Sequence, residues 1–175
     1  MVHALRRLAA LIEGLIDRLG NLTAWIALVM IGLVATNVLL RYSMSVGSVW
    51  AQELEWHLLA ALILLGMSHA LQRGDNVRVD IFYARYQPAT KRVVDVVSAL
   101  LLIAVAVAFI LLSLGYVQQS WSVNEASPDP GGIPYRWAVK ALIPLGYGLL
   151  VLQQIAHLIR LLTNPLTPAA EARHV

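Results

Sequence analysis

Four apolar runs of about 20 or more residues each constrain the fold of this 175-residue chain more than any other feature. A helix needs about 20 predominantly apolar residues to cross the ~30 Å hydrocarbon core of a bilayer, so each run is long enough to span a membrane. Because lipid offers the backbone no hydrogen-bonding partners, runs that cross it must be helical. The expected spans are residues 21–40, 51–72, 93–116 and 135–162.

A soluble four-helix bundle is the alternative architecture. Each of its helices would need a polar face, and residues 100–112 have none. The chain is 59% hydrophobic and 13% charged, whereas soluble domains average roughly 45–50% apolar and about 25% charged residues. We therefore predict an all-α membrane protein with a single four-helix transmembrane domain over residues 1–175.

Residues 3–20, before the first span, have a different pattern. Apolar residues recur at helical spacing and charged residues occupy the remaining positions. This pattern predicts an amphipathic helix that lies in the membrane interface. A signal peptide is the rival interpretation, but Glu13 and Asp17 interrupt the apolar stretch and no small-residue cleavage site follows. At the other end, residues 163–175 hold two prolines and are expected to form a mobile tail.

Prolines and glycines refine two of the spans. Pro88 suits the first turn of the third helix, which would then run about 34 residues to Trp121 and exceed the membrane thickness. Pro144 removes a backbone donor and is expected to kink the fourth helix. Gly146 and Gly148 would allow close approach of a neighbouring helix.

The basic residues are distributed unevenly between the two sides of the membrane. Four spans place both termini on one side, and ten of the thirteen basic residues fall in segments on that side. The other side has only Arg41, Arg136 and Lys140. The positive-inside rule therefore predicts cytoplasmic termini. The net charge of +3 is too small to suggest nucleic-acid binding.

Motifs of catalysis and of metal binding are missing from the sequence. It has no cysteine, no HExxH pattern and no phosphate-binding glycine loop. It also lacks the paired broken helices typical of a substrate site at the membrane midplane. We therefore expect no enzymatic activity, no metal and no cofactor, and predict a scaffold for another membrane subunit.

Charged residues at the outer ends of the spans are the first candidate site. Arg41 faces Glu53 and Glu55 across a short turn, and the group forms either an ion pair that fixes the hairpin or a contact for a partner. Arg136 and Lys140 lie one helical turn apart. They either extend toward the interface or meet acidic residues, those of a partner or Glu53 and Glu55.

Charged residues at the inner ends form the second candidate site. Gly74 is expected to end the second helix in a left-handed cap, next to Arg73, Arg78 and Asp80. These three residues form either a polar cluster for docking of a partner subunit or a loop that binds lipid headgroups. Asp95 is expected to pair locally with Lys91 and Arg92.

Two histidines provide an alternative function. His69 and His157 are placed at similar depth near the inner ends of the second and fourth spans. Four-helix membrane cytochromes use such pairs as axial haem ligands, so a haem-binding anchor subunit of a redox complex is the alternative.

Several motifs together resemble those of a known family. They are Asn37-x-x-x-Arg41-Tyr42, then Trp50-x-x-Glu53-Leu54-Glu55, then the stretch from His69 to Asp80, and finally Ile133-Pro134, Trp137 and Pro144-Leu145-Gly146. From about residue 21 to residue 162 the chain resembles the small, DctQ-type membrane subunit of tripartite ATP-independent periplasmic (TRAP) transporters. One difference is Asn76, where the family commonly has histidine.

The resemblance implies partners and a location. It implies a large membrane subunit that carries substrate and sodium, a periplasmic binding protein that delivers the substrate, and a small subunit that enlarges the fixed scaffold. The loop SPDPGGIP is similar to that of a subgroup linked to organic-acid uptake. The expected location is the bacterial inner membrane, in contact with lipid.

Overall fold

The computed structural model describes residues 2–75 and 80–163, and these residues are helical apart from their connections. Four helices are long, and a single-turn helix lies between the second and the third of them. Their bounds are α1 Val2–Met44, α2 Val49–Arg73, α3 Asp80–Tyr83, α4 Pro88–Ser122 and α5 Trp137–Thr163. The four long helices are each long and apolar enough to cross a membrane, which confirms the predicted all-α membrane fold.

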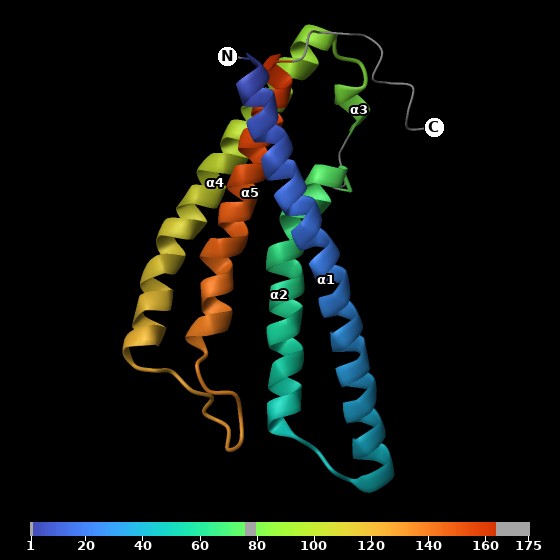
Figure 1. Ribbon diagram of the computed structural model, residues 1–175, viewed down its shortest axis with the longest axis vertical. Helices are drawn as coiled ribbons and strands as arrows, with labels where there is room; N and C mark the ends of the chain where they lie inside the picture. Colours follow the sequence, from blue (N-terminus) through green and yellow to red (C-terminus); the bar gives the residue numbers. More distant parts are fainter. Residues whose placement is uncertain (1, 76–79, 164–175) are drawn as a thin grey trace.

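The long helices form two antiparallel pairs, α1 with α2 and α4 with α5 (Figure 1). The pairs lie close together at one end, where the amino terminus, α3 and the end of α5 meet (Figure 1). We call this the basic end, because Arg6, Arg92 and Arg160 lie there. At the opposite end, which we call the hairpin end, residues 45–48 connect α1 to α2 and residues 123–136 connect α4 to α5.

Helix α1 differs from the expectation of a separate amphipathic helix over residues 3–20. It continues without a break through Gly20 into the first span. Its buried residues are Ala9, Ile16, Gly20 and Thr23, all in its first half. Of the apolar residues that suggested an interfacial helix, Ile16 packs against the bundle, whereas Leu5, Leu8 and Leu15 stay exposed. The physical reason is that small side chains at this spacing let α1 approach α2 and α5 closely.

Helix α5 is the centre of the bundle and packs against α1, α2 and α4. It continues through Pro144 as one helix. At Gly146 a Cβ atom would lie 2.5 Å from the backbone oxygen of Leu64 on α2, so the expected close approach is confirmed there. At Gly148 a Cβ would meet nothing within 4 Å, so that part of the expectation was wrong.

Helix α4 begins at Pro88, as predicted, and its 35 residues correspond to about 52 Å. Its buried residues are Ala99, Ala106, Ser113 and Ser120, which are seven residues apart and all small. A seven-residue spacing keeps these side chains on one face of the helix. This small-residue stripe is the surface on which α4 meets α5.

Candidate interaction sites at the two ends of the bundle

A buried carboxylate fastens the hairpin end. Glu53, near the start of α2, is only 6% exposed. One of its oxygens accepts a hydrogen bond from the hydroxyl of Ser127, and the other accepts one from the backbone N–H of Ile133 at 2.6 Å. Both donors belong to the loop 123–136, which extends toward the start of α2 (Figure 1). The carboxylate therefore ties α2 to the connection between α4 and α5.

Gly132 allows the loop to close over this carboxylate. A Cβ atom at this position would lie 2.4 Å from the Ser127 hydroxyl oxygen and 2.7 Å from a carboxylate oxygen of Glu53. Within the loop, the Ser127 N–H donates to the Ile133 carbonyl at 3.2 Å. A side chain at Gly132 would displace the group that donates to Glu53.

A second carboxylate in the same loop holds the start of α5. Glu125 accepts a hydrogen bond from the ammonium of Lys140, which also lies 3.9 Å from the centre of the Tyr116 ring. The Arg136 N–H donates to the Glu125 carbonyl at 2.9 Å. The hydrogen bond from Lys140, together with the charge of Arg136, lowers the pKa of the Glu125 carboxyl below its ordinary value. Lys140 therefore meets an acid of its own chain, and that acid is neither Glu53 nor Glu55.

Arg41 is placed differently from the expected ion pair. Its predicted partner Glu53 is bound by the loop, and Glu55 accepts a hydrogen bond from the side-chain amide of Asn37 at 3.1 Å. Arg41 is exposed and forms no ion pair among the residues that the structure describes. Glu53 and Glu55 accept hydrogen bonds from other groups. Those that donate to Glu53 belong to a loop more than 70 residues further along the chain.

At the basic end, an acidic residue of α1 meets two residues of α2. A carboxylate oxygen of Asp17 lies 3.3 Å from a guanidinium nitrogen of Arg73 and 3.6 Å from Nδ1 of His69. The His69 ring also occupies the space above Gly20, where a Cβ atom would come within 2.2 Å of it. Arg73 therefore joins α2 to α1, a contact not anticipated from the sequence.

The end of α5 is held by side chains of α1 and α4. Arg160 donates to both carboxylate oxygens of Glu13, at 3.0 and 2.5 Å. Arg6 donates to the Thr163 carbonyl and Arg92 to the Leu161 carbonyl. The last carbonyls of a helix lack partners within the helix, and cationic side chains are favoured there. The contacts of Arg6 and Glu13 fasten the first half of α1 to α5, and that of Arg92 joins α4 to α5.

The predicted cluster of Arg73, Arg78 and Asp80 is described only in part. Arg73 meets Asp17, whereas Arg78 and the side chain of Asp80 lie outside the described part of the structure, as do residues 164–175 of the predicted tail. Gly74 has a φ of 75° and its N–H donates to the Leu71 carbonyl, so the left-handed cap is confirmed.

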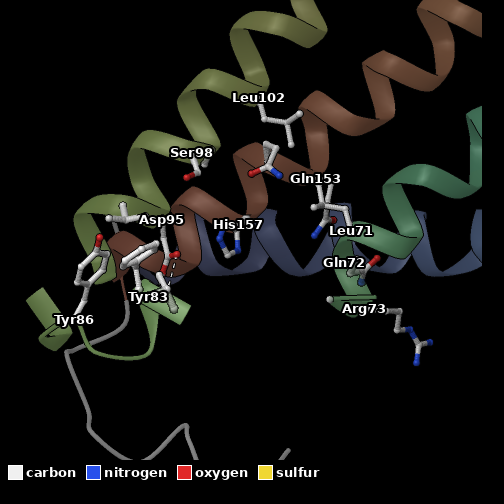
Figure 2. Close-up of a pocket in the computed structure, with 15 residues that line it drawn as sticks. Leu71, Gln72, Arg73, Tyr83, Tyr86, Asp95, Ser98, Leu102, Gln153 and His157 are labelled. Carbon is white, nitrogen blue, oxygen red and sulfur yellow. Dashed lines mark hydrogen bonds between the residues drawn. The ribbon is translucent and has the colours of Figure 1, made fainter. Parts of the chain in front are cut away.

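A cavity of about 580 Å³ lies near this cap, lined by residues of α2, α3, α4 and α5 (Figure 2). The Tyr83 hydroxyl lies 3.0 and 2.9 Å from the two carboxylate oxygens of Asp95. Among the described residues Asp95 has no ion pair with Lys91 or Arg92, so the expected local pairing was wrong. Arg92 instead reaches α5.

The two histidines of the haem alternative have different surroundings. His157 lines the cavity (Figure 2), whereas His69 packs on Gly20 and Asp17 of α1 and is not part of the cavity wall. The structure therefore does not bring the two imidazoles together in one pocket. Within the described residues it also has no group of three or more histidine, aspartate or glutamate side chains that would hold a metal ion.

Sequence reasoning missed the residues that bind these charged groups. Ser127 and the Ile133 N–H are ordinary loop groups, and no local pattern marks them as partners of Glu53. Glu13 and Asp17 did carry a signal. They are four residues apart, and thus on one helix face, and they lie on the same side as Arg73 and Arg160 in the predicted topology.

Comparison with known proteins identifies the family. A model of the family described as "Tripartite ATP-independent periplasmic transporters, DctQ component" matches residues 30–164, which is most of the chain. A comparison with curated proteins finds no match. The matched region contains α2 to α5 and the end of α1 from residue 30, together with the Glu53 and Glu125 contacts at the hairpin end. The chain therefore belongs to the DctQ family, the small membrane components of TRAP transporters.

Proposed function

We propose that this chain is a scaffold subunit of a sodium-coupled transporter for organic acids and has no transport site of its own. A large membrane subunit would carry substrate and sodium, and a periplasmic binding protein would deliver the substrate. In this proposal the chain is not an enzyme and needs no cofactor.

The observation that carries the scaffold role is the large apolar surface that the chain leaves uncovered. In the most apolar 18-residue window of α1 none of the residues is buried within the chain, and in that of α4 only 17% are buried. A soluble protein would have to cover such surfaces, whereas a membrane subunit presents them to lipid and to neighbouring subunits. The polar contacts at the two ends hold these helices in place, which suits a fixed framework.

The charged residues at the ends have proposed roles in the same assembly. Arg41, exposed at the hairpin end, is proposed to contact a partner protein on the periplasmic side. Glu53, Glu55, Arg136 and Lys140 support that end through the contacts described above. Arg73, Arg78 and Asp80 are proposed to contribute to docking of the large subunit on the cytoplasmic side.

Reconstitution in liposomes tests the division of labour. We expect the chain alone to give no uptake of a panel of radiolabelled carboxylates under a sodium gradient. Together with the large subunit and the binding protein it should support uptake, and replacing the sodium gradient by potassium should abolish this uptake. The matched control is the large subunit with the binding protein but without this chain.

Two outcomes would contradict the proposal. Uptake by the chain alone, above that of empty liposomes, would show that it has its own transport site. Full uptake by the large subunit without this chain would show that the scaffold is not required.

A further inference from the structure

Several polar groups in the wall of the cavity at the basic end lack hydrogen-bond or ionic partners within the described part of the chain. Asp95 accepts from the Tyr83 hydroxyl and has no cationic partner among the described residues. Gln153 and Gln154 of α5 also line the cavity and are only 6% and 4% exposed. The side-chain oxygens of both glutamines are buried and have no hydrogen-bond partner within the described part of the chain. Buried polar groups normally have such partners, so these side chains point to a ligand.

From these observations we propose that the cavity binds an aminophospholipid, with its primary ammonium group on Asp95 and the glutamine amides beside it. The proposal is independent of the scaffold role, because it concerns a lipid site within this chain alone.

The unpaired polar groups of the cavity wall are acceptors, so the ligand must supply hydrogen-bond donors. A carboxylate has about four acceptor positions, and a tyrosine hydroxyl supplies one proton. The remaining positions on Asp95 suit an ammonium group, which has three N–H donors and a positive charge. The unpaired side-chain oxygens of Gln153 and Gln154 are further acceptors for such a donor.

The position of the cavity selects a lipid over a water-soluble amine. Leu71, Val94 and Leu102 form an apolar part of the wall, and Phe82 and Tyr86 line it with rings that are 68% and 41% exposed. Exposed aromatic rings are typical of the boundary between hydrocarbon and headgroups. Beyond the cavity, the exposed surface of α4 is apolar and offers a path for acyl chains, as at Val93 and Val97.

A cationic side chain near Asp95 adds positive charge at the edge of the cavity. Lys91 precedes Asp95 by one helical turn, and its ammonium lies 5.6 Å from the centre of the Tyr83 ring. The cavity therefore has a carboxylate inside and a cation near its edge, an arrangement that complements the ammonium and the phosphate of a zwitterionic headgroup. Arg73 contributes less, since its guanidinium points away from the cavity (Figure 2) and meets Asp17.

Native mass spectrometry of the purified full chain tests the site. The chain would be exposed to an equimolar mixture of phosphatidylethanolamine and phosphatidylcholine with identical acyl chains. The two lipids share the phosphate, but the trimethylated amine of phosphatidylcholine has no N–H donor. We expect bound phosphatidylethanolamine to exceed phosphatidylcholine by about tenfold, as expected for a charge-assisted hydrogen bond. Phosphatidylglycerol, which has no amine, should bind no better than phosphatidylcholine.

A matched pair of variants tests whether Asp95 causes the preference for phosphatidylethanolamine over phosphatidylcholine. Asp95→Asn should bring the ratio of the two lipids close to one, whereas Asp129→Asn, at the hairpin end, should leave it near tenfold. The lipid comparison on the unaltered chain needs no variant, so it tests the proposal even if Asp95→Asn fails to fold.

Four results would overturn the proposal. One is equal retention of the two lipids by the unaltered chain, and another is an unchanged preference in Asp95→Asn. The third is displacement of the lipid by millimolar phosphoethanolamine, which would identify a soluble amine as the ligand. Loss of the bound lipid when the large subunit co-purifies would assign the cavity to a protein side chain and would overturn it as well.

Discussion

Single residues decide how closely the helices of this protein approach. Gly146 of α5 lies against the backbone of α2, where a Cβ atom would be 2.5 Å from the Leu64 oxygen. Gly146→Ala should therefore force the helices apart and destabilise the bundle by about 1–3 kcal/mol. Thermal unfolding in detergent, followed by circular dichroism, measures the effect. Gly148→Ala is the matched control, because its new methyl group meets nothing, and equal destabilisation by both variants would contradict the prediction.

A second residue makes the hairpin end sensitive to acid. The pKa of Glu125 is lowered in the folded chain, chiefly by the hydrogen bond from Lys140. A carboxyl with a lowered folded pKa stabilises the fold above its unfolded pKa, and this contribution is lost as the pH falls through the folded value. We therefore expect the contact between Trp121 and Trp137, whose ring centres are 4.3 Å apart at this end, to loosen below the ordinary glutamate pKa of about 4.5.

Near-ultraviolet circular dichroism between pH 7 and pH 3, compared with that of a Trp121→Phe variant, isolates the signal of this tryptophan pair from those of the other aromatic residues. Glu125→Gln should weaken the signal at neutral pH and remove its change in the acid range. Glu55→Gln, whose oxygen still accepts from Asn37, should keep the acid transition. A transition that persists unchanged in Glu125→Gln would assign it to another group.

At the scale of the element, α4 meets α5 through a stripe of small residues at intervals of seven. Ala106 in this stripe is fully buried, whereas Ala104, two residues earlier, is exposed on the same helix. Ala106→Leu adds volume to a filled contact and should cost about 1–3 kcal/mol, whereas Ala104→Leu should change stability little. Thermal unfolding of the two variants measures this difference in stability. An Ala106→Leu protein as stable as the unaltered chain would show that α4 and α5 do not meet on this face.

At the scale of the whole molecule, the excess of basic residues at one end predicts its orientation. Ten basic residues lie on the side of the termini and three on the other side, so we expect both termini in the cytoplasm. Reporter fusions in residues 84–87 and in residues 129–132 should report opposite compartments, the first cytoplasmic and the second periplasmic. A periplasmic signal from residues 84–87 would reverse the predicted topology.

The sequence by itself determined the fold class, because a continuous apolar run of about 20 residues satisfies its own backbone in lipid as a helix, and the four apolar runs are long enough to cross the membrane. It also determined the start of α4 at Pro88 and the cap at Gly74, since proline and glycine restrict the local backbone whatever surrounds them. The family resemblance, which rests on motifs along the chain, was confirmed by the match over residues 30–164.

Only the tertiary structure decided which charged groups meet. Glu53 binds a loop more than 70 residues further along the chain, and Arg160 binds Glu13 of α1. Spacing along one helix predicts neighbours on that helix, but contacts between helices depend on their relative rotation. In an apolar bundle this rotation is set by small residues such as Ala106 and Gly146, which sequence patterns do not distinguish from residues that face lipid. The same reason explains why residues 3–20 suggested a separate interfacial helix: their exposed leucines suit a membrane surface, and the pattern does not show that Ala9, Ile16 and Gly20 pack against the bundle.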